Sequence, residues 1–532
     1  MFVLLKTRLD TMRISADPDA AAVKKALKEV GVSPAVCVNS HILSRSIDSR
    51  RGTPILQYSI LAELRDDVSG VPELEAASPE ILLAAAEPRL ELPDSRLLHP
   101  IVVGTGPCGL FAALALAMAG TKPIVLDRGQ AVDTRYADYQ RFLQTRELDE
   151  ASNLLIGEGG AGTFSDGKLY TGTKDPRAAF ILKTFADAGA PQEIRYDKRP
   201  HIGSDKLRVS IAAIRQKIIS LGGEFRFGCA VNGPWIENNV CKGVITADGE
   251  RLEAPAVLIA PGLGGRDLVE MLEQQGVEYA LKSFQIGCRI EHPQELIDDR
   301  QFNLRGRSRP QCLGAAEYHM VSRPGGNAAN VSTFCMCPGG EVLNATAWKN
   351  QSVTNGMSDS ARSGKFANGC LIMTLPPERF ASSGEIREFL SLLEKRCFQM
   401  GGGDYTLPAQ DAAAFVAGRG GLSKRGCSCG IGVVPGRLDE LVPGELQTAL
   451  RAAIRHFDRL CRGFEKEGIL IGLESCVSSP VRFIRQPENL MSSCKNLWLG
   501  GEGVGAAGGI MSAAVDGIRL AECMLKLNSD SF

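Results

Sequence analysis

The sequence lacks the features that mark several specialised classes of protein. Its 60 basic residues balance its 61 acidic residues, so no net charge draws it to nucleic acid or to an anionic membrane. The longest apolar run, Leu110 to Ala119, is about half of the roughly twenty residues that a transmembrane helix needs. The N-terminus offers no long apolar segment followed by a cleavage site, and no internal repeat is visible. We therefore expect no nucleic-acid partner and no membrane partner.

Histidine is scarce and regular cysteine spacing is missing. There are six histidines, and a single histidine is more often a hydrogen-bonded structural residue than a catalyst. The sixteen cysteines contain two CxC pairs, Cys335 with Cys337 and Cys427 with Cys429, and no CxxC pair. This usage favours a reducing cytoplasm over a disulfide framework, and we expect no metal site. A redox role for the first pair stays open as an alternative.

Glycine, in contrast, is abundant: 58 of 532 residues, or about 11%, against an average near 7%. The glycines are spread through the chain and form no low-complexity tract. Such an excess is typical of a backbone that approaches a ligand closely. The glycine-rich piece from 400 to 436 predicts a long loop system, either a lid over a site or a flexible surface connection.

The order of predicted elements divides the chain into four parts. Residues 1–65 predict a small α+β, ferredoxin-like module, with strands at 2–9, 35–42 and 53–64 and a helix after Asp17. Its RSIDSRR run, 45–51, is either a recognition surface or a solvated face. An acidic, proline-rich linker spans 66–100 and holds at most one short helix, over 80–86. A Rossmann-like α/β domain is predicted for 101–274 together with 475–532, and an inserted α+β substrate or cap domain for 275–474.

The segment from Ile101 to Asp127 predicts a dinucleotide-binding unit. Gly104, Gly106 and Gly109 form a GxGxxG pattern that follows an apolar strand and opens an alanine-rich helix. The first glycine permits a tight turn, the second lets the backbone approach a pyrophosphate, and the third lets the helix pack on the strand. Asp127 ends the next strand, where a carboxylate can accept hydrogen bonds from ribose hydroxyls. The alternative is a helix-packing glycine cluster without a ligand.

A second glycine cluster favours FAD over NAD as that dinucleotide. GGEGVGAAGG, residues 500–509, precedes a helix that starts near Ile510. The N-terminus of a far C-terminal helix can stabilise negative charge on a reduced flavin, whereas NAD would leave this segment without a ligand. A packed Gly/Ala helix is the structural alternative.

Several longer motifs carry a resemblance to a known family. GEGGAGTFSDGKLYT from Gly157, HIGSDKLR from His201, IGCRIEHPQELID from Ile286, STFCMCPGGEV from Ser332 and SSPVRFIR from Ser478 resemble the bacterial family described as uncharacterised FAD-dependent, or NAD(FAD)-utilising, dehydrogenases. This family lies within the two-dinucleotide-binding-domain flavoproteins, and the likeness covers nearly the whole chain. The resemblance implies bound FAD and oxidoreductase activity on a substrate that is not established.

The resemblance and the glycine motifs together give a set of expected FAD-binding residues. These residues are Gly104, Gly106, Pro107, Gly109, Asp127, Arg128, Gly159, Gly160, Gly162, Thr163, Val231, Ala260, Gly262, Gly501, Glu502, Gly509, Ile510 and Met511.

The expected catalytic residues are Lys168, His201, Arg289, Cys335 and Arg482. Lys168 either holds negative charge on the reduced flavin or pairs structurally with Asp166. The chain has Cys476 and Val477 where the family pattern would place an arginine–threonine pair before SSP, so anion recognition would fall to Arg482.

We expect an FAD-dependent oxidoreductase that exchanges hydride between flavin N5 and a small molecule. NAD(P)H is a transient electron donor at most, because Gly262 to Asp267 lacks the third glycine of a second fingerprint. The alternative is a flavin-containing redox sensor without turnover. The substrate, the redox partner and the oligomeric state are not readable from the sequence.

Overall fold

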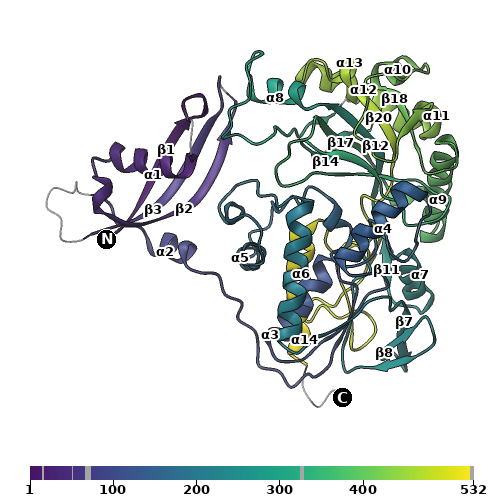
Figure 1. Ribbon diagram of the computed structural model, residues 1–532. Helices are drawn as coiled ribbons and strands as arrows, with labels where there is room; N and C mark the ends of the chain where they lie inside the picture. Colours follow the sequence, from purple (N-terminus) through teal and green to yellow (C-terminus); the bar gives the residue numbers. More distant parts are fainter. Residues whose placement is uncertain (15–16, 51, 66–73, 324–328, 528–532) are drawn as a thin grey trace.

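The computed structural model describes residues 1–532 except 15–16, 51, 66–73, 324–328 and 528–532. The N-terminal module is a three-stranded antiparallel sheet in the order β1-β3-β2 with one helix, α1. Figure 1 shows it at one side of the molecule. The bounds are β1 Phe2–Asp10, α1 Pro18–Glu29, β2 Cys37–Asp48 and β3 Ile55–Leu64. Asp17 caps α1 by accepting from the backbone N–H groups of Asp19 and Ala20. A strand inserted between two strands joined by a helix is the split βαβ unit of ferredoxin-like folds.

β2 continues six residues beyond the predicted strand, through the first part of the RSIDSRR run. The Arg45 backbone pairs with Tyr196 and Lys198, and its guanidinium donates to Asp197 at 2.6 Å and to Asp19 at 3.0 Å. Arg45 therefore joins the module to the rest of the chain, which neither of the two sequence interpretations foresaw. Arg51, at the end of the run, lies outside the described residues.

The linker contains one short helix, α2 (Pro79–Ala85), as the sequence predicts. Ala76 forms a bridge with Val3, at the edge of the sheet where a ferredoxin-like fold places a fourth strand. After α2 an extended segment leads to the main body (Figure 1). The first part of the predicted linker, 66–73, lies outside the described residues.

The main body contains a five-stranded parallel sheet in the order β22-β10-β4-β5-β6. Its strands are β4 Ile101–Val103, β5 Ile124–Leu126, β6 Glu224–Arg226, β10 Val257–Ile259 and β22 Leu497–Leu499. Four of them are continuous apolar runs, as expected of strands covered on both faces. One face packs on α3 (Pro107–Met118), α5 (Arg177–Asp187), α6 (Ser204–Ser220) and α14 (Ile510–Leu525). The other packs on α7 (Arg266–Gln274) and a meander of β7 (Val231–Glu237), β8 (Val240–Thr246) and β9 (Arg251–Glu253). This is the Rossmann-like α/β fold predicted from the sequence.

The second large sheet has seven strands in the order β13-β14-β17-β12-β20-β18-β19. Its strands are β12 Phe284–Pro293, β13 Val321–Ser322, β14 Val331–Cys337, β17 Phe366–Leu375, β18 Leu407–Asp411, β19 Val433–Pro435 and β20 Ile469–Glu474. The associated helices are α8 Gln294–Phe302, α9 Ser383–Met400, α10 Ala412–Ala417, α11 Leu438–Leu441, α12 Gly444–Leu460 and α13 Phe464–Glu467. The apolar core of this sheet is continuous with that of the N-terminal module.

Two short ribbons and a further α-helix lie outside these sheets. Two short ribbons pair β11 with β21 and β15 with β16. Their bounds are β11 Tyr279–Leu281, β15 Glu341–Asn344, β16 Thr354–Met357 and β21 Val481–Phe483, and α4 spans Val132–Thr145. Among the described helices, none combines the length and the apolar character needed to cross a bilayer. The domain boundaries drawn from the sequence stay predictions.

The prediction of a long loop over 400–436 is wrong. This segment contributes β18 and β19 to the seven-stranded sheet and forms α10 between them. The residues Leu407, Pro408 and Ala409 are buried in β18, so part of the glycine-rich piece belongs to the core. None of its described residues lines the large cavity described next, and it is therefore no lid over that site.

Candidate functional site

A cavity of about 830 Å³ lies between the carboxyl ends of the parallel strands and the seven-stranded sheet. This volume is at the upper end of the range for small-molecule and cofactor sites. We call the side formed by the Rossmann-like sheet the nucleotide wall and the opposite side, to which β14 contributes, the substrate wall. The carboxyl edge of an open parallel sheet is where α/β proteins bind their ligands.

The GxGxxG turn forms the start of the nucleotide wall. Gly104 has φ +94°, and a Cβ there would lie 2.3 Å from the Ala260 carbonyl oxygen. A Cβ on Gly109 would lie 1.8 Å from the Gly104 carbonyl oxygen, so this position is filled by backbone and does not reach the cavity. Gly106 is the N-cap of α3 and borders the cavity with Pro107. The helix N-terminus is thus open to an anion.

Asp127, at the end of β5, both braces this turn and borders the cavity. One carboxylate oxygen accepts from the Thr105 backbone N–H at 2.8 Å and from the Thr105 hydroxyl, and the other accepts from the Gly129 N–H at 2.8 Å. A carboxylate has about four acceptor positions, so Asp127 retains capacity for a ribose hydroxyl. Its neighbour Arg128 pairs with Asp267 at 2.7 Å and also borders the cavity.

The segment from Gly157 to Thr163 folds against the turn. Gly160 and Gly162 border the cavity. Gly159 and Thr163 lie behind them, because a Cβ on Gly159 would meet the Thr163 hydroxyl at 2.0 Å and Thr163 is fully buried. These two expected FAD contacts therefore support the segment without lining the cavity.

Arg135 on α4 supports the segment from Gly157 to Thr163, and the sequence analysis did not predict this role. It is fully buried, and its guanidinium donates to the backbone carbonyls of Asn153 and Glu158. The Glu158 carboxylate in turn pairs with Arg215 at 2.8 Å. No local motif marks Arg135, since an arginine within an amphipathic helix normally faces solvent.

The C-terminal glycine cluster completes the nucleotide wall. Gly509 has φ +74° with open space where a Cβ would be, and it begins α14, whose first residue Ile510 borders the cavity. Met511 is buried in the helix core instead. Gly501 and Glu502 also border the cavity, and burial raises the pKa of Glu502 to about 7. Three further expected contacts border it as well: Val231, Ala260 and Gly262.

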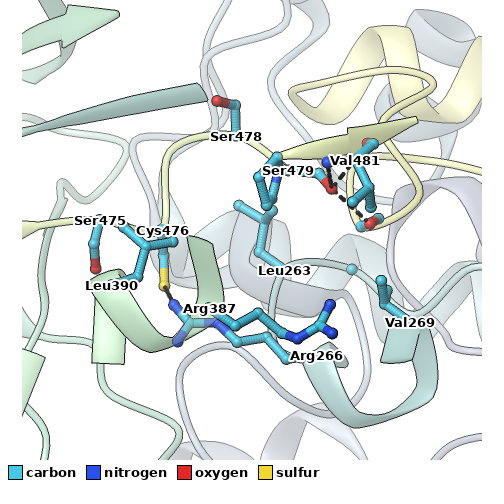
Figure 2. Close-up of a pocket in the computed structure, with 13 residues that line it drawn as sticks. Leu263, Arg266, Val269, Arg387, Leu390, Ser475, Cys476, Ser478, Ser479 and Val481 are labelled. Carbon is cyan, nitrogen blue, oxygen red and sulfur yellow. Dashed lines mark hydrogen bonds between the residues drawn. The ribbon is translucent and has the colours of Figure 1, made fainter. Parts of the chain in front are cut away.

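A small adjoining pocket shows how this cluster is fixed (Figure 2). The Ser479 hydroxyl lies 2.9 Å from the Gly503 carbonyl oxygen and 3.1 Å from that of Val481. Arg266 donates to the Cys476 sulfur and pairs with the buried carboxylate of Glu394. Cys476 lies between this pocket and the large cavity. The position where the family pattern would place an arginine thus presents the Cys476 thiol at the border of the cavity.

Lys168 and Cys335 are the two expected catalytic residues that line the cavity. The Lys168 ammonium lies 3.3 Å from Asp166, whose carboxylate also binds the Arg362 guanidinium. Burial alone would lower the pKa of Lys168, but the charge of Asp166 outweighs it and the pKa is raised. Lys168 is therefore a cation at the cavity that pairs with Asp166, which is the structural one of the two interpretations made from the sequence.

The other three expected catalytic residues do not line the cavity. His201 lies behind Lys168 with its Nε2 near the Ser360 carbonyl, and burial lowers its pKa. Arg289 is fully buried in β12 and binds both carboxylate oxygens of Glu474 at 2.7 Å. Arg482 points out of the small β11–β21 ribbon and contacts the Gly505 carbonyl. Anion recognition in the cavity therefore does not come from Arg482.

The nucleotide wall fits an extended dinucleotide better than a compact ligand. Two helix N-termini, those of α3 and α14, open onto one cavity, and positive φ angles bring glycine backbone to its surface at Gly104, Gly262, Gly501 and Gly509. A dinucleotide with a pyrophosphate and a flavin offers a negative group to each helix N-terminus. Within the described residues no cluster of histidine, cysteine and carboxylate side chains could hold a metal ion.

Comparisons with known proteins agree with this reading. Residues 283–477 match the family model described as "FAD-dependent protein, C-terminal domain-like". A protein of Clostridium beijerinckii, described as uncharacterized, is 36% identical over 536 residues and covers 98% of both chains.

Solved structures show more distant similarity. Fructosamine oxidase (Amadoriase II) of Aspergillus fumigatus is 13% identical, with 82% of this chain and 87% of that chain covered and a TM-score of 0.35. L-proline dehydrogenase of P. horikoshii is 10% identical, with 81% and 93% covered and a TM-score of 0.34. With a relative 36% identical along nearly its full length, the chain belongs to the same family as that protein, and residues 283–477 match the C-terminal domain of FAD-dependent proteins.

Proposed function

We propose that the protein exchanges hydride between bound FAD and a small molecule that occupies the same cavity against the substrate wall. When bound, FAD supplies the two-electron chemistry, through its N5 position. One observation carries the proposal: a single cavity joins the glycine-lined nucleotide wall to Lys168 and Cys335 on the substrate wall. A flavin on the first wall would face a reactant on the second.

The chain's own residues would stabilise charge in this cavity. Lys168 places a cation there, fixed by Asp166. The N-terminus of α14 adds the partial positive charge of a helix end. Both favour an electron-rich reduced state over the oxidised one, because preorganised positive groups stabilise negative charge where it develops.

We propose that NAD(P)H, if it is the electron donor, binds only transiently and has no binding site of its own. The turn from Gly262 to Asp267 follows β10 of the same parallel sheet, and it borders the cavity that FAD would fill. It therefore offers no separate nucleotide site, which supports a donor that enters and leaves the substrate side.

We further propose that the protein works in the cytoplasm on a small molecule or a redox partner, without nucleic acid or a membrane. All sixteen cysteines are free thiols, which suits a reducing compartment. The balanced charge gives no attraction to polyanions.

Spectroscopy on the purified protein tests the proposal. The protein should be yellow and release FAD on denaturation, and anaerobic NADH, NADPH or a fractionated metabolite pool should bleach the flavin, with recovery on adding an electron acceptor. A protein that binds FAD but is reduced by none of these would instead be a flavin-containing redox sensor without turnover. A colourless protein that takes up no added FAD would overturn the proposal that FAD is the cofactor.

A further inference from the structure

β14 presents two cysteines at the substrate wall in different surroundings. Cys335 lines the cavity, whereas Cys337 is fully buried beneath it. The pairing with β17 shifts register between Phe334 and Cys337, so the strand contains an extra residue at this point. Cys335 has φ +43°, a left-handed conformation that non-glycine residues rarely adopt. A bulge of this kind re-aims a side chain next to a functional site.

The charged groups around Cys335 come from three segments. Arg289 on β12 donates to the Cys335 carbonyl at 3.1 Å, Lys168 borders the same cavity, and Glu474 on β20 is held by Arg289. A hydrogen bond from the Cys337 thiol, helped by the positive charges of Arg289 and Lys168, lowers the pKa of Cys335 against burial and the charge of Glu474. The same hydrogen bond and burial raise the pKa of Cys337. The two thiols thus differ: the pKa of Cys335 is lowered and that of Cys337 is raised.

This asymmetry is absent from comparable cysteines of the chain. The second CxC pair, Cys427 and Cys429, does not line the cavity, and burial raises both pKa values, that of Cys429 to about 12. Cys476 does line the cavity, but burial raises its pKa to about 11. Cys335, in contrast, both lines the cavity and has a lowered pKa.

We propose that Cys335 and Cys337 form a redox-active dithiol that reduces a small disulfide admitted to the cavity. The Cys335 thiolate attacks one sulfur of the substrate, the substrate S–S bond breaks, and the first product leaves as a thiolate. The Cys337 thiol then loses its proton and attacks the Cys335 sulfur, which releases the second product thiolate and leaves a Cys335–Cys337 disulfide. Two electrons pass from the dithiol to the substrate, and the one proton of Cys337 goes to a product.

The spacing of the pair suits a reversible bond. The two cysteines lie close together, with the Cys337 thiol 3.4 Å from the Cys335 carbonyl oxygen, and a disulfide across a single residue departs from ordinary disulfide geometry. Strained disulfides are the readily reduced, catalytic ones. The exchange itself requires no flavin, so this proposal and the proposed hydride transfer can fail separately.

The test uses the FAD-containing protein and 4,4′-dithiodipyridine as the disulfide, with stopped-flow detection of released thiopyridone. The wild type should release two equivalents per chain in the fastest phase, and tandem mass spectrometry should find Cys335 joined to Cys337. Cys337→Ser should release one equivalent and keep a stable pyridyl adduct on Cys335. Cys335→Ser should lose the fastest phase.

Cys427→Ser/Cys429→Ser is the matched control and should leave the fastest phase unchanged. FAD content checks that each variant is folded. The proposal is overturned if the fastest phase survives in Cys335→Ser, or if the wild type accumulates a pyridyl adduct on Cys335 instead of the internal disulfide.

Discussion

The two walls of the cavity are built from different materials. The nucleotide wall is largely backbone: glycines with positive φ and the first turns of α3 and α14. The substrate wall is made of side chains held by buried ion pairs, Arg289 with Glu474 and Arg362 with Asp166. The first wall should therefore be sensitive to an added methyl group and the second to a lost charge. FAD content reports on the first, and thiol reactivity on the second.

The largest expected effect is on the substrate wall. Arg289→Met leaves the buried Glu474 carboxylate without its partner, and breaking a buried ion pair costs about 3–5 kcal/mol of folding free energy. Urea unfolding measures this loss. The control is Arg300→Met, which removes an exposed pair with Asp299 and should cost less than about 1 kcal/mol. Equal losses of folding free energy in the two variants would show that the buried ion pair does not stabilise the fold more than an exposed one.

Next in size is a change confined to the nucleotide wall. Gly104→Ala places a methyl group 2.3 Å from the Ala260 carbonyl oxygen, so the turn must shift and FAD affinity should fall by more than about tenfold, or 1.4 kcal/mol. Gly276→Ala is the control, because its φ is also positive and the space around it is open, but Gly276 does not border the cavity. Isothermal titration with FAD compares the two. If both variants bind FAD equally, close backbone packing is not what shapes this wall.

A smaller effect separates charge from structure on the substrate wall. Lys168→Met removes a cation that helps to lower the pKa of Cys335. Since only the thiolate attacks, the rate of the fast thiol reaction should fall as pH drops through that pKa, and the variant's profile should move to higher pH. Lys168→Arg should restore it. FAD content should stay near that of the wild type. An unmoved profile would remove Lys168 from the control of Cys335.

The smallest expected effect is a pH dependence of the nucleotide wall. Burial raises the pKa of Glu502 to about 7, so the side chain is neutral below that pH and negative above it. A carboxylate that borders the cavity would repel the negatively charged FAD, and the dissociation constant for FAD should rise by roughly threefold between pH 6 and 8. Glu502→Gln should flatten this dependence. A steeper dependence in the variant would contradict the assignment.

The same contrast decides what the sequence could predict. The GxGxxG turn, Asp127 and the start of α14 are defined by spacing within short segments, so the sequence located the nucleotide wall. The ion pairs of the substrate wall join residues 185 and 196 positions apart, and an arginine destined for burial has the same local pattern as an exposed one. The sequence predicts a catalytic role for Arg289, but Arg289 pairs with Glu474 behind the cavity and does not line it. Arg135 was missed for the same reason.

The glycine content of residues 400–436 led to a wrong prediction of a long loop. A glycine excess indicates close backbone approach, but it does not say whether a ligand or another strand is approached. At Gly436 a Cβ would meet the Pro408 ring at 2.6 Å, so this glycine of the 400–436 segment serves strand packing. The loop prediction failed because close packing between strands and close contact with a ligand both require glycine.

The N-terminal module bears on how this protein could be shortened. Its apolar core is continuous with that of the seven-stranded sheet, and Arg45 ties its edge strand to Asp197 and Tyr196. A chain starting near residue 95 would keep every glycine of the nucleotide wall. It would also expose the apolar surface of the seven-stranded sheet that the N-terminal module covers. Trimming the protein to its cofactor-binding part would therefore yield aggregates, and proteolysis in the segment before α2 should leave the two pieces associated.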